Sequence, residues 1–212
     1  MIEIIPAILP SSDSELEETL TRIQGVGGMV QIDLVGKNIL QGRDSMPLWE
    51  EFDFEFDIFL KDAEQDVASL VALGASRIVI HRESKNALQA LQSVQHLRGG
   101  SYAVEIGLGL RVDDTPSALE TYAGLYDYVQ VMGIAQEGVQ GQPFDERCLT
   151  LVSELRSANP TLTLQVDGGV DALHIPRLIA AGANRLVVGH AIFSAQDPVA
   201  AYAELVKEAN AS

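Results

Sequence analysis

The chain has 212 residues, of which 47% are hydrophobic and 21% charged, the balance of a globular protein with a sizeable core. Its formal net charge of −16 argues against a nucleic-acid surface, because phosphate contacts need a basic patch. No apolar run approaches the roughly 20 residues of a membrane span. The opening "MIEIIPAILP" lacks the regions of a signal peptide, so we expect a cytoplasmic protein without membrane contacts. The single cysteine, Cys148, excludes an internal disulfide and a thiolate metal cluster.

Short apolar runs rich in Val, Ile and Leu recur along the chain and predict eight strands. These runs are Ile2–Ile5, Met29–Leu34, Phe54–Leu60, Ile78–His81, Ala103–Leu108, Tyr128–Val131, Thr163–Val166 and Arg185–Gly189. Amphipathic stretches such as "SELEETLTRIQ" and "AEQDVASLVALG" lie between them and predict helices. Continuous apolar strands are typical of a parallel sheet that is covered on both faces. Eight strand–helix units in about 210 residues fit a compact (β/α)₈ barrel.

A doubly wound open sheet is the alternative α/β architecture. Such a sheet more typically has five or six units and a glycine-rich turn after its first strand. Here the first strand is followed by "PAILPSS", which is not a dinucleotide-binding fingerprint, and no linker or low-complexity segment divides the chain. The sequence therefore predicts an α/β protein, a single (β/α)₈ TIM barrel that occupies residues 1–212.

The functional site of such a barrel lies at the carboxyl ends of its strands, and two of the predicted strands end in acids. In "VQIDLVGK", Gln31 and Asp33 share one face, which points inward if the alternating apolar residues face the helices. The seventh strand ends at Asp167, directly before Gly168 and Gly169. Each acid alone could be an ordinary turn or loop residue. Together they favour a pair that exchanges protons with a substrate.

Other strand ends offer residues that could bind a substrate and its phosphate. Barrels often bind phosphate through backbone amides after the seventh and eighth strands. The long loop "VMGIAQEGVQGQPF" after the sixth strand has the composition of a mobile lid. The glycines could instead be simple turns, and a lone histidine more often only bonds to a neighbouring loop. The predicted binding residues are His81, Gly138, Gly141, Gln142, Gly168, Gly169, Gly189 and His190.

Motifs along almost the whole chain resemble those of the ribulose-phosphate 3-epimerase family. The segments "IIPAILPSS" and "VQIDLVGKNI" resemble its first two strands, and "DIFLKD" and "VIHRES" stand at its third and fourth. The most specific combination is "DYVQVMGIAQEGVQGQPF", "VDGGV" and "AGANRLVVGHAIF", which resemble its lid and its two phosphate-binding turns. The resemblance implies the barrel fold, a small phosphorylated sugar as substrate, and self-association into a homo-oligomer.

In that family, two aspartates exchange protons with opposite faces of C3 of a keto-sugar phosphate. A divalent metal, held by these acids and two histidines, stabilises the enediolate. The resemblance implies that the acids are Asp33 and Asp167, whereas the histidines fall at Gln31 and Phe59 and are missing. A phenylalanine cannot coordinate a cation, and an amide is a poor replacement for imidazole around zinc. We therefore expect no zinc site, and at most a weakly held divalent ion such as Mg²⁺ on Asp33 and Asp167.

Without a metal, another group has to stabilise the enediolate. Lys61 follows Phe59 by two residues, so both project to the same side, and we hypothesise that Lys61 is catalytic. Alternatively, Lys61 is a surface residue whose aliphatic stem packs on the rim of the barrel and whose ammonium group stays in water.

Three functions stay open: an epimerase or isomerase acting on a pentulose 5-phosphate type of sugar, a lyase of the same superfamily, and a non-catalytic sugar-phosphate-binding paralogue. The lyases have an Asp-x-Lys-x-x-Asp signature on the third strand, which aligns here with Phe59, Lys61 and Glu64.

Overall fold

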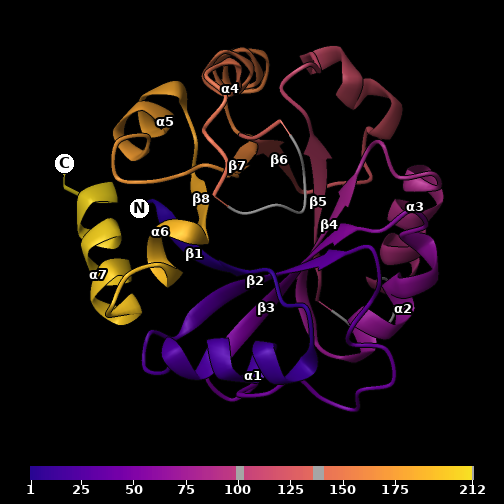
Figure 1. The fold of residues 1–212 in the computed structure, drawn as a ribbon. Helices are drawn as coiled ribbons and strands as arrows, with labels where there is room; N and C mark the ends of the chain where they lie inside the picture. Colours follow the sequence, from indigo (N-terminus) through magenta and orange to yellow (C-terminus); the bar gives the residue numbers. More distant parts are fainter. Residues whose placement is uncertain (99–102, 136–140, 212) are drawn as a thin grey trace.

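Eight parallel strands form a closed barrel in the computed structural model, which describes residues 1–98, 103–135 and 141–211 (Figure 1). The strands are β1 (Glu3–Ile8), β2 (Gly28–Val35), β3 (Phe52–Phe59), β4 (Ala75–His81), β5 (Glu105–Leu110), β6 (Tyr128–Met132), β7 (Thr163–Asp167) and β8 (Arg185–Val188). Each strand pairs with the next, and β8 closes the barrel on β1, where Pro6 lies opposite Val188. The predicted TIM barrel is confirmed, and each of the eight predicted strands overlaps an observed one.

Helices surround the barrel on its outside (Figure 1). They are α1 (Asp13–Arg22), α2 (Glu64–Ala72), α3 (Ala87–Arg98), α4 (Arg147–Ala158), α5 (Ile175–Ala181), α6 (His190–Phe193), α7 (Pro198–Ala209) and the 3₁₀ helix η1 (Pro116–Tyr122). The expectation of a helix after every strand is wrong twice: residues 36–51 join β2 to β3 through turns, and only η1 follows β5. Gly36 and Gly42 in the first connection adopt positive φ, and Pro47 lacks the N–H that a helix interior needs.

The hydrophobic core lies between the strands and the helices, and the barrel interior is largely polar. Strand β2 shows the division: Val30 and Ile32 belong to the buried apolar cluster, whereas Gln31 and Asp33 alternate with them on the inner face. Fully burying an outward side chain such as Phe56 stabilises the fold by about 2–3 kcal/mol. The strands are therefore anchored from outside, which leaves the inner face available for chemistry.

Two arginines close the amino-terminal end of the interior. Arg77 binds Glu3 at 3.1 Å and Glu105 at 3.0 Å, and Arg185 binds Glu105 at 2.9 Å. The guanidinium of Arg185 also lies 4.9 Å from the centre of the Tyr128 ring. This ring of charges closes the end of the barrel opposite to the three aspartates described below. Within the part of the chain that the structure describes, no helix combines the length and apolarity needed to cross a membrane.

Candidate active site

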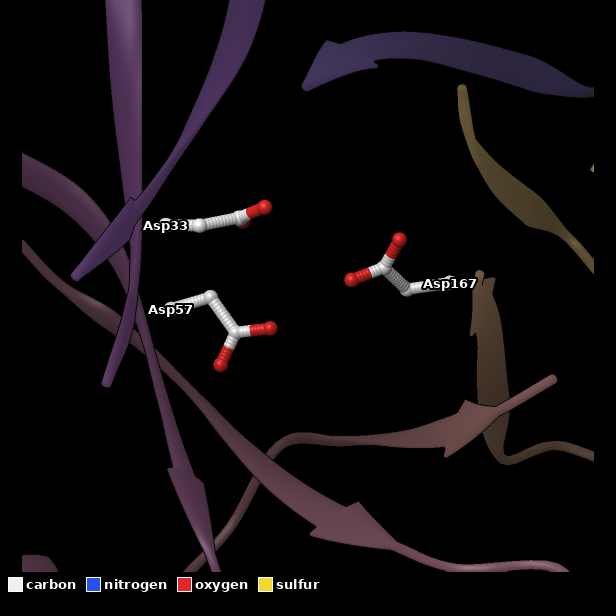
Figure 2. Close-up of side chains that lie close together, drawn as sticks. All are labelled: Asp33, Asp57 and Asp167. Carbon is white, nitrogen blue, oxygen red and sulfur yellow. The ribbon is translucent and has the colours of Figure 1, made fainter. Parts of the chain in front are cut away.

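Three aspartates converge in the barrel interior. Asp33 and Asp57 come from the neighbouring strands β2 and β3, where they pair in register, and Asp167 comes from β7. Figure 2 shows Asp33 and Asp57 on one wall and Asp167 on the opposite wall, with the carboxyl groups directed toward one another. One oxygen of each lies within 4.8 Å of the others. The two acids expected from the sequence, Asp33 and Asp167, therefore meet inside the barrel.

The amide of Gln31 lies between these carboxyl groups. Its Nε2 donates hydrogen bonds to Asp33 Oδ1 at 2.8 Å and to Asp167 Oδ2 at 3.0 Å. A longer contact of 3.5 Å reaches Asp57 Oδ2. Gln31 is fully buried. The residue that stands in place of an expected histidine thus donates hydrogen bonds to Asp33 and Asp167 and lies near Asp57.

Asp57 is a site residue that the sequence analysis missed. Its Oδ1 lies 2.6 Å from His81 Nε2, and its Oδ2 accepts a 2.6 Å hydrogen bond from Gln130 Nε2. The ring of Phe59 stacks on His81 with centroids 4.4 Å apart. Gly109 makes room for this histidine, because a Cβ there would lie 2.3 Å from the imidazole. Asp57 is therefore held in one position by side chains of two further strands.

A local signal for Asp57 exists in the segment "FDFEFDIF" of β3. Acids alternate there with phenylalanines at a period of two, and Glu55 and Asp57 fall on the inner face. Gln130 in "YVQVM" and Gln165 in "TLQVD" follow the same rule. The description of the strands as continuously apolar is correct only for their outer faces.

Glu55 forms a second polar layer below the aspartates. It accepts hydrogen bonds from Tyr128 Oη at 2.7 Å and from Gln165 Nε2 at 2.6 Å. Gly107 gives the tyrosine its space, since a Cβ there would lie 2.6 Å from the ring. Burial raises the pKa of Glu55 to about 7, although these hydrogen bonds and Arg77 act in the opposite direction. Ionising an acid in the barrel interior is thus unfavourable, and the polar groups there form hydrogen bonds with one another.

The environment raises the pKa values of both expected catalytic acids. Burial, followed by the charge of Asp57, raises the pKa of Asp167 to about 7, whereas the hydrogen bond from Gln31 lowers it. Burial also raises the pKa of Asp33 well above its usual value, and the charges of Asp167 and Asp57 add to this effect. Two close acids in such a site share protons near neutral pH. One can then donate a proton while the other accepts one.

A cavity of about 410 Å³ opens above Asp33 and Asp167 at the carboxyl ends of the strands. The turn Gly168-Gly169 borders it, and both glycines have positive φ, 100° and 69°. A Cβ at Gly169 would lie 2.8 Å from the backbone of Phe144, so the turn requires glycine for conformation and for space. The other predicted residues that line this cavity are Phe59, Gly141, Gln142, Gly189 and His190, and Ala7 lines it too.

Two of the predicted residues, Lys61 and His81, lie outside this cavity. Lys61 is exposed and lines a separate hollow with His81, while Phe59 borders both spaces. Lys61 therefore shares a hollow with Phe59, as their spacing predicted, but it follows the end of β3 and does not line the cavity of Asp33 and Asp167. His81 supports Asp57 beneath the cavity. Gly138 lies outside the described residues.

The three carboxyl oxygens are close enough together to hold a metal ion, but the donor set that the resemblance implies is absent. Gln31 presents N–H groups to one oxygen of Asp33 and one of Asp167, and the Phe59 ring has no lone pair. A cation on Asp33 Oδ1 and Asp167 Oδ2 would face the same N–H groups. The residues present do not fit the two-acid, two-histidine set of that family.

The fold and the cavity define a (β/α)₈ barrel with its functional site at the carboxyl ends of the strands. The chain belongs to the ribulose-phosphate 3 epimerase family, whose model matches residues 3–193. It is 27% identical over 229 residues to the chloroplastic ribulose-5-phosphate-3-epimerase of Arabidopsis thaliana, covering 100% of this chain and 77% of that protein. It is 25% identical over 218 residues to the ribulose-phosphate 3-epimerase of Bacillus subtilis, with 97% and 98% covered. Membership supports a sugar-phosphate enzyme of the isomerase type.

Solved structures with low sequence identity share the fold. A 3-hexulose-6-phosphate synthase superposes with a TM-score of 0.72 at 20% identity, covering 98% of this chain and 99% of that one. KGPDC from Streptococcus mutans superposes with a TM-score of 0.73 at 14% identity, covering 100% and 99%. These likenesses concern the barrel alone.

Proposed function

We propose that this protein epimerises a small keto-sugar phosphate of the pentulose 5-phosphate type, with Asp33 and Asp167 as its two acid/base groups. The observation that carries the proposal is their position: both line one cavity, from opposite walls, beside the Gly168-Gly169 turn. Inversion of a carbon next to a carbonyl needs one proton acceptor and one proton donor on its two faces. Two buried acids with raised pKa values supply both at neutral pH.

In this mechanism the phosphate lies against the backbone of Gly169 and Gly189, near His190, and the carbon to be inverted lies between the acids. The ionised acid removes the proton and becomes neutral, and the electron pair of the C–H bond moves into an enediolate. The other, neutral acid then gives its proton to the opposite face and becomes ionised. The number of protons on the pair is the same before and after turnover, so the reverse reaction uses the same groups with exchanged roles.

A lyase is the second candidate, and the position of Asp57 bears on it. Counted from this buried acid, the third-strand signature reads Asp57-x-Phe59-x-x-Asp62, with both acids present and phenylalanine in place of lysine. The alignment on Phe59, Lys61 and Glu64 has its middle residue outside the cavity. Among the residues that the structure describes, no lysine lines the cavity. The geometry thus favours the epimerase.

Incubation with D-ribulose 5-phosphate in D₂O tests the proposal. We expect deuterium at C3 and formation of the C3 epimer, detected by NMR. Asp33→Asn and Asp167→Asn should each lower the epimerisation rate by at least about 100-fold, the usual contribution of a general acid or base. Each variant should still exchange the C3 proton with solvent deuterium in one of the two epimers, namely the epimer whose C3 proton faces the remaining acid. Asp44→Asn, an exposed acid, is the matched control.

Lys61→Ala tests the catalytic role of Lys61 that was hypothesised from the sequence. We expect an unchanged epimerisation rate, because Lys61 lies outside the cavity. Cleavage of a carbon–carbon bond in the same assay would replace the epimerase with the lyase. Binding of the sugar phosphate with neither exchange nor cleavage would indicate the non-catalytic paralogue.

A further inference from the structure

The Gln31 amide contacts only one oxygen of each catalytic acid. Its Nε2 binds Asp33 Oδ1 and Asp167 Oδ2 at 2.8 and 3.0 Å. An amide nitrogen has two hydrogens, one for each of these bonds. Within the described part of the chain, no hydrogen bond reaches the opposite oxygens, Asp33 Oδ2 and Asp167 Oδ1. Both acids line the cavity, whereas Gln31 lies beneath its floor.

A chain of glutamines fixes the orientation of this amide. Gln165 Nε2 donates to Gln130 Oε1 at 2.7 Å and lies 3.4 Å from Gln31 Oε1. Gln165 is itself held by its 2.6 Å bond to Glu55, and Gln130 by its 2.6 Å bond to Asp57. If the Gln31 amide were turned over, its NH₂ would face the NH₂ of Gln165, and its oxygen would face three carboxyl groups. The first contact is repulsive, and so is the second toward every ionised carboxylate, so the donor side of Gln31 belongs with the acids.

A cation held between Asp33 and Asp167 at the place of the Gln31 amide would need the same two oxygens. Magnesium lies 2.0–2.1 Å from its oxygen ligands and needs lone pairs directed toward it. Hydrogens from Gln31 already point at the two oxygens that would be shared, and the second lost ligand position is filled by the Phe59 ring, which packs on His81. The two residues that replace the family's histidines are therefore both held in place, Gln31 by hydrogen bonds and Phe59 by packing.

We infer that Gln31 is the positioning residue of this site, and that its amide takes over the task of holding Asp33 and Asp167 together, so that the acid pair operates without a metal. This inference rests on the proposed function for its catalytic part. Its structural part, an acid cluster organised by an amide donor and closed to divalent cations, stands independently of any turnover. Gln31 contacts neither substrate nor cavity and acts through the two acids.

The first test measures metal binding and needs no substrate. Protein treated with EDTA and then titrated with Zn²⁺ or Mn²⁺ in a calorimeter should show no binding at the acid cluster, so Asp33→Asn and unmodified protein should give equal heats. The double variant Gln31→His, Phe59→His supplies two imidazoles beside the acids, and we expect it to bind one Zn²⁺ that Asp33→Asn removes. One equivalent of either ion bound by the unmodified protein and lost in Asp33→Asn would overturn the inference, whether or not the protein turns over.

The second test uses exchange at C3 of D-ribulose 5-phosphate. We expect equal rates with EDTA and with added Mn²⁺. Gln31→Leu should lower kcat by about 100-fold, the cost of misplacing catalytic groups by about 1 Å, and change KM by less than about threefold. Gln31→Asn keeps the donor on a shorter side chain and should recover part of the loss. Gln92→Leu, an exposed glutamine of α3, is the matched control.

An unchanged kcat in Gln31→Leu, or a rate that requires Mn²⁺, would refute the positioning role. If the unmodified protein shows no exchange, the proposed function fails, and the calorimetric result alone decides the structural part of the inference. Circular dichroism of each variant separates loss of positioning from loss of fold.

Discussion

Replacement of Asp57 by asparagine should move the pH dependence of exchange to lower pH. Asp57 lies below the cavity, and its charge raises the pKa values of both Asp33 and Asp167. Asparagine has nearly the same shape and can still accept the hydrogen bond from Gln130. The substitution therefore removes one negative charge and leaves the packing almost unchanged.

The size of the effect follows from the spacing of the acids. Two unit charges about 5 Å apart interact by about 3 kcal/mol at an effective dielectric constant of about 20, equivalent to roughly 2 pH units. His81 and Gln130, each 2.6 Å from Asp57, weaken its field, so we expect about 1 to 2 pH units. The pKa of Asp167, about 7 in the unmodified protein, should then fall to roughly 5 to 6.

Two measurements check this prediction. In the exchange assay, the whole rate profile should move to lower pH: the limb that follows ionisation of Asp167 and the limb that follows loss of the proton of Asp33 should both shift by about 1 to 2 pH units. Carboxyl ¹³C NMR follows the same titrations without substrate. Profiles and titrations that stay in place, or move to higher pH, would show that the charge of Asp57 does not control the pair. Asp44→Asn controls for a general change in net charge.

Two further variants test the turn and the buried second layer. Gly169→Ala should lower the free energy of unfolding by about 1–3 kcal/mol, through its positive φ and the contact with the Phe144 backbone. Urea denaturation measures this loss. Gly36 has φ of +72° but open space around it, so Gly36→Ala isolates the cost of the backbone conformation. Equal losses in the two variants would argue against a contribution from the contact with Phe144. Glu55→Gln should flatten the pH dependence of stability. Because the folded-state pKa of Glu55 is raised to about 7 from 4.5, the folded protein binds more protons between these values, and its stability falls by about 3 kcal/mol as pH rises through this window. An undiminished fall in the variant would assign the effect to the aspartates.

Much of this fold follows from local patterns in the sequence. Eight apolar runs predicted the eight strands, because each strand has to bury its outer face against helices. This requirement selects apolar residues within a few positions of one another, so it can be recognised in the sequence. The meeting of Asp33 and Asp167 was also predictable, since closure of a parallel barrel brings the carboxyl ends of all strands to one rim. The position of the Gly168-Gly169 turn beside them follows from the same rule.

The tertiary structure decided which polar residues join Gln31, Asp33 and Asp167 in the interior. Acids that alternate with phenylalanines on a strand form the same sequence pattern whether their face is exposed to solvent or points into a closed barrel. The burial of Asp57 and Glu55 could therefore be recognised only from the closed barrel. Lys61 shows the converse: its spacing from Phe59 predicted a place beside the acids, but it lies beyond the end of β3, in a separate hollow that Phe59 also borders, and does not line the cavity of Asp33 and Asp167. The direction of the Gln31 amide depends on two other strands: β7, which holds Gln165 and Asp167, and β6, which holds Gln130. Sequence patterns specify faces of single strands, whereas the partners of a buried polar group come from strands far away along the chain.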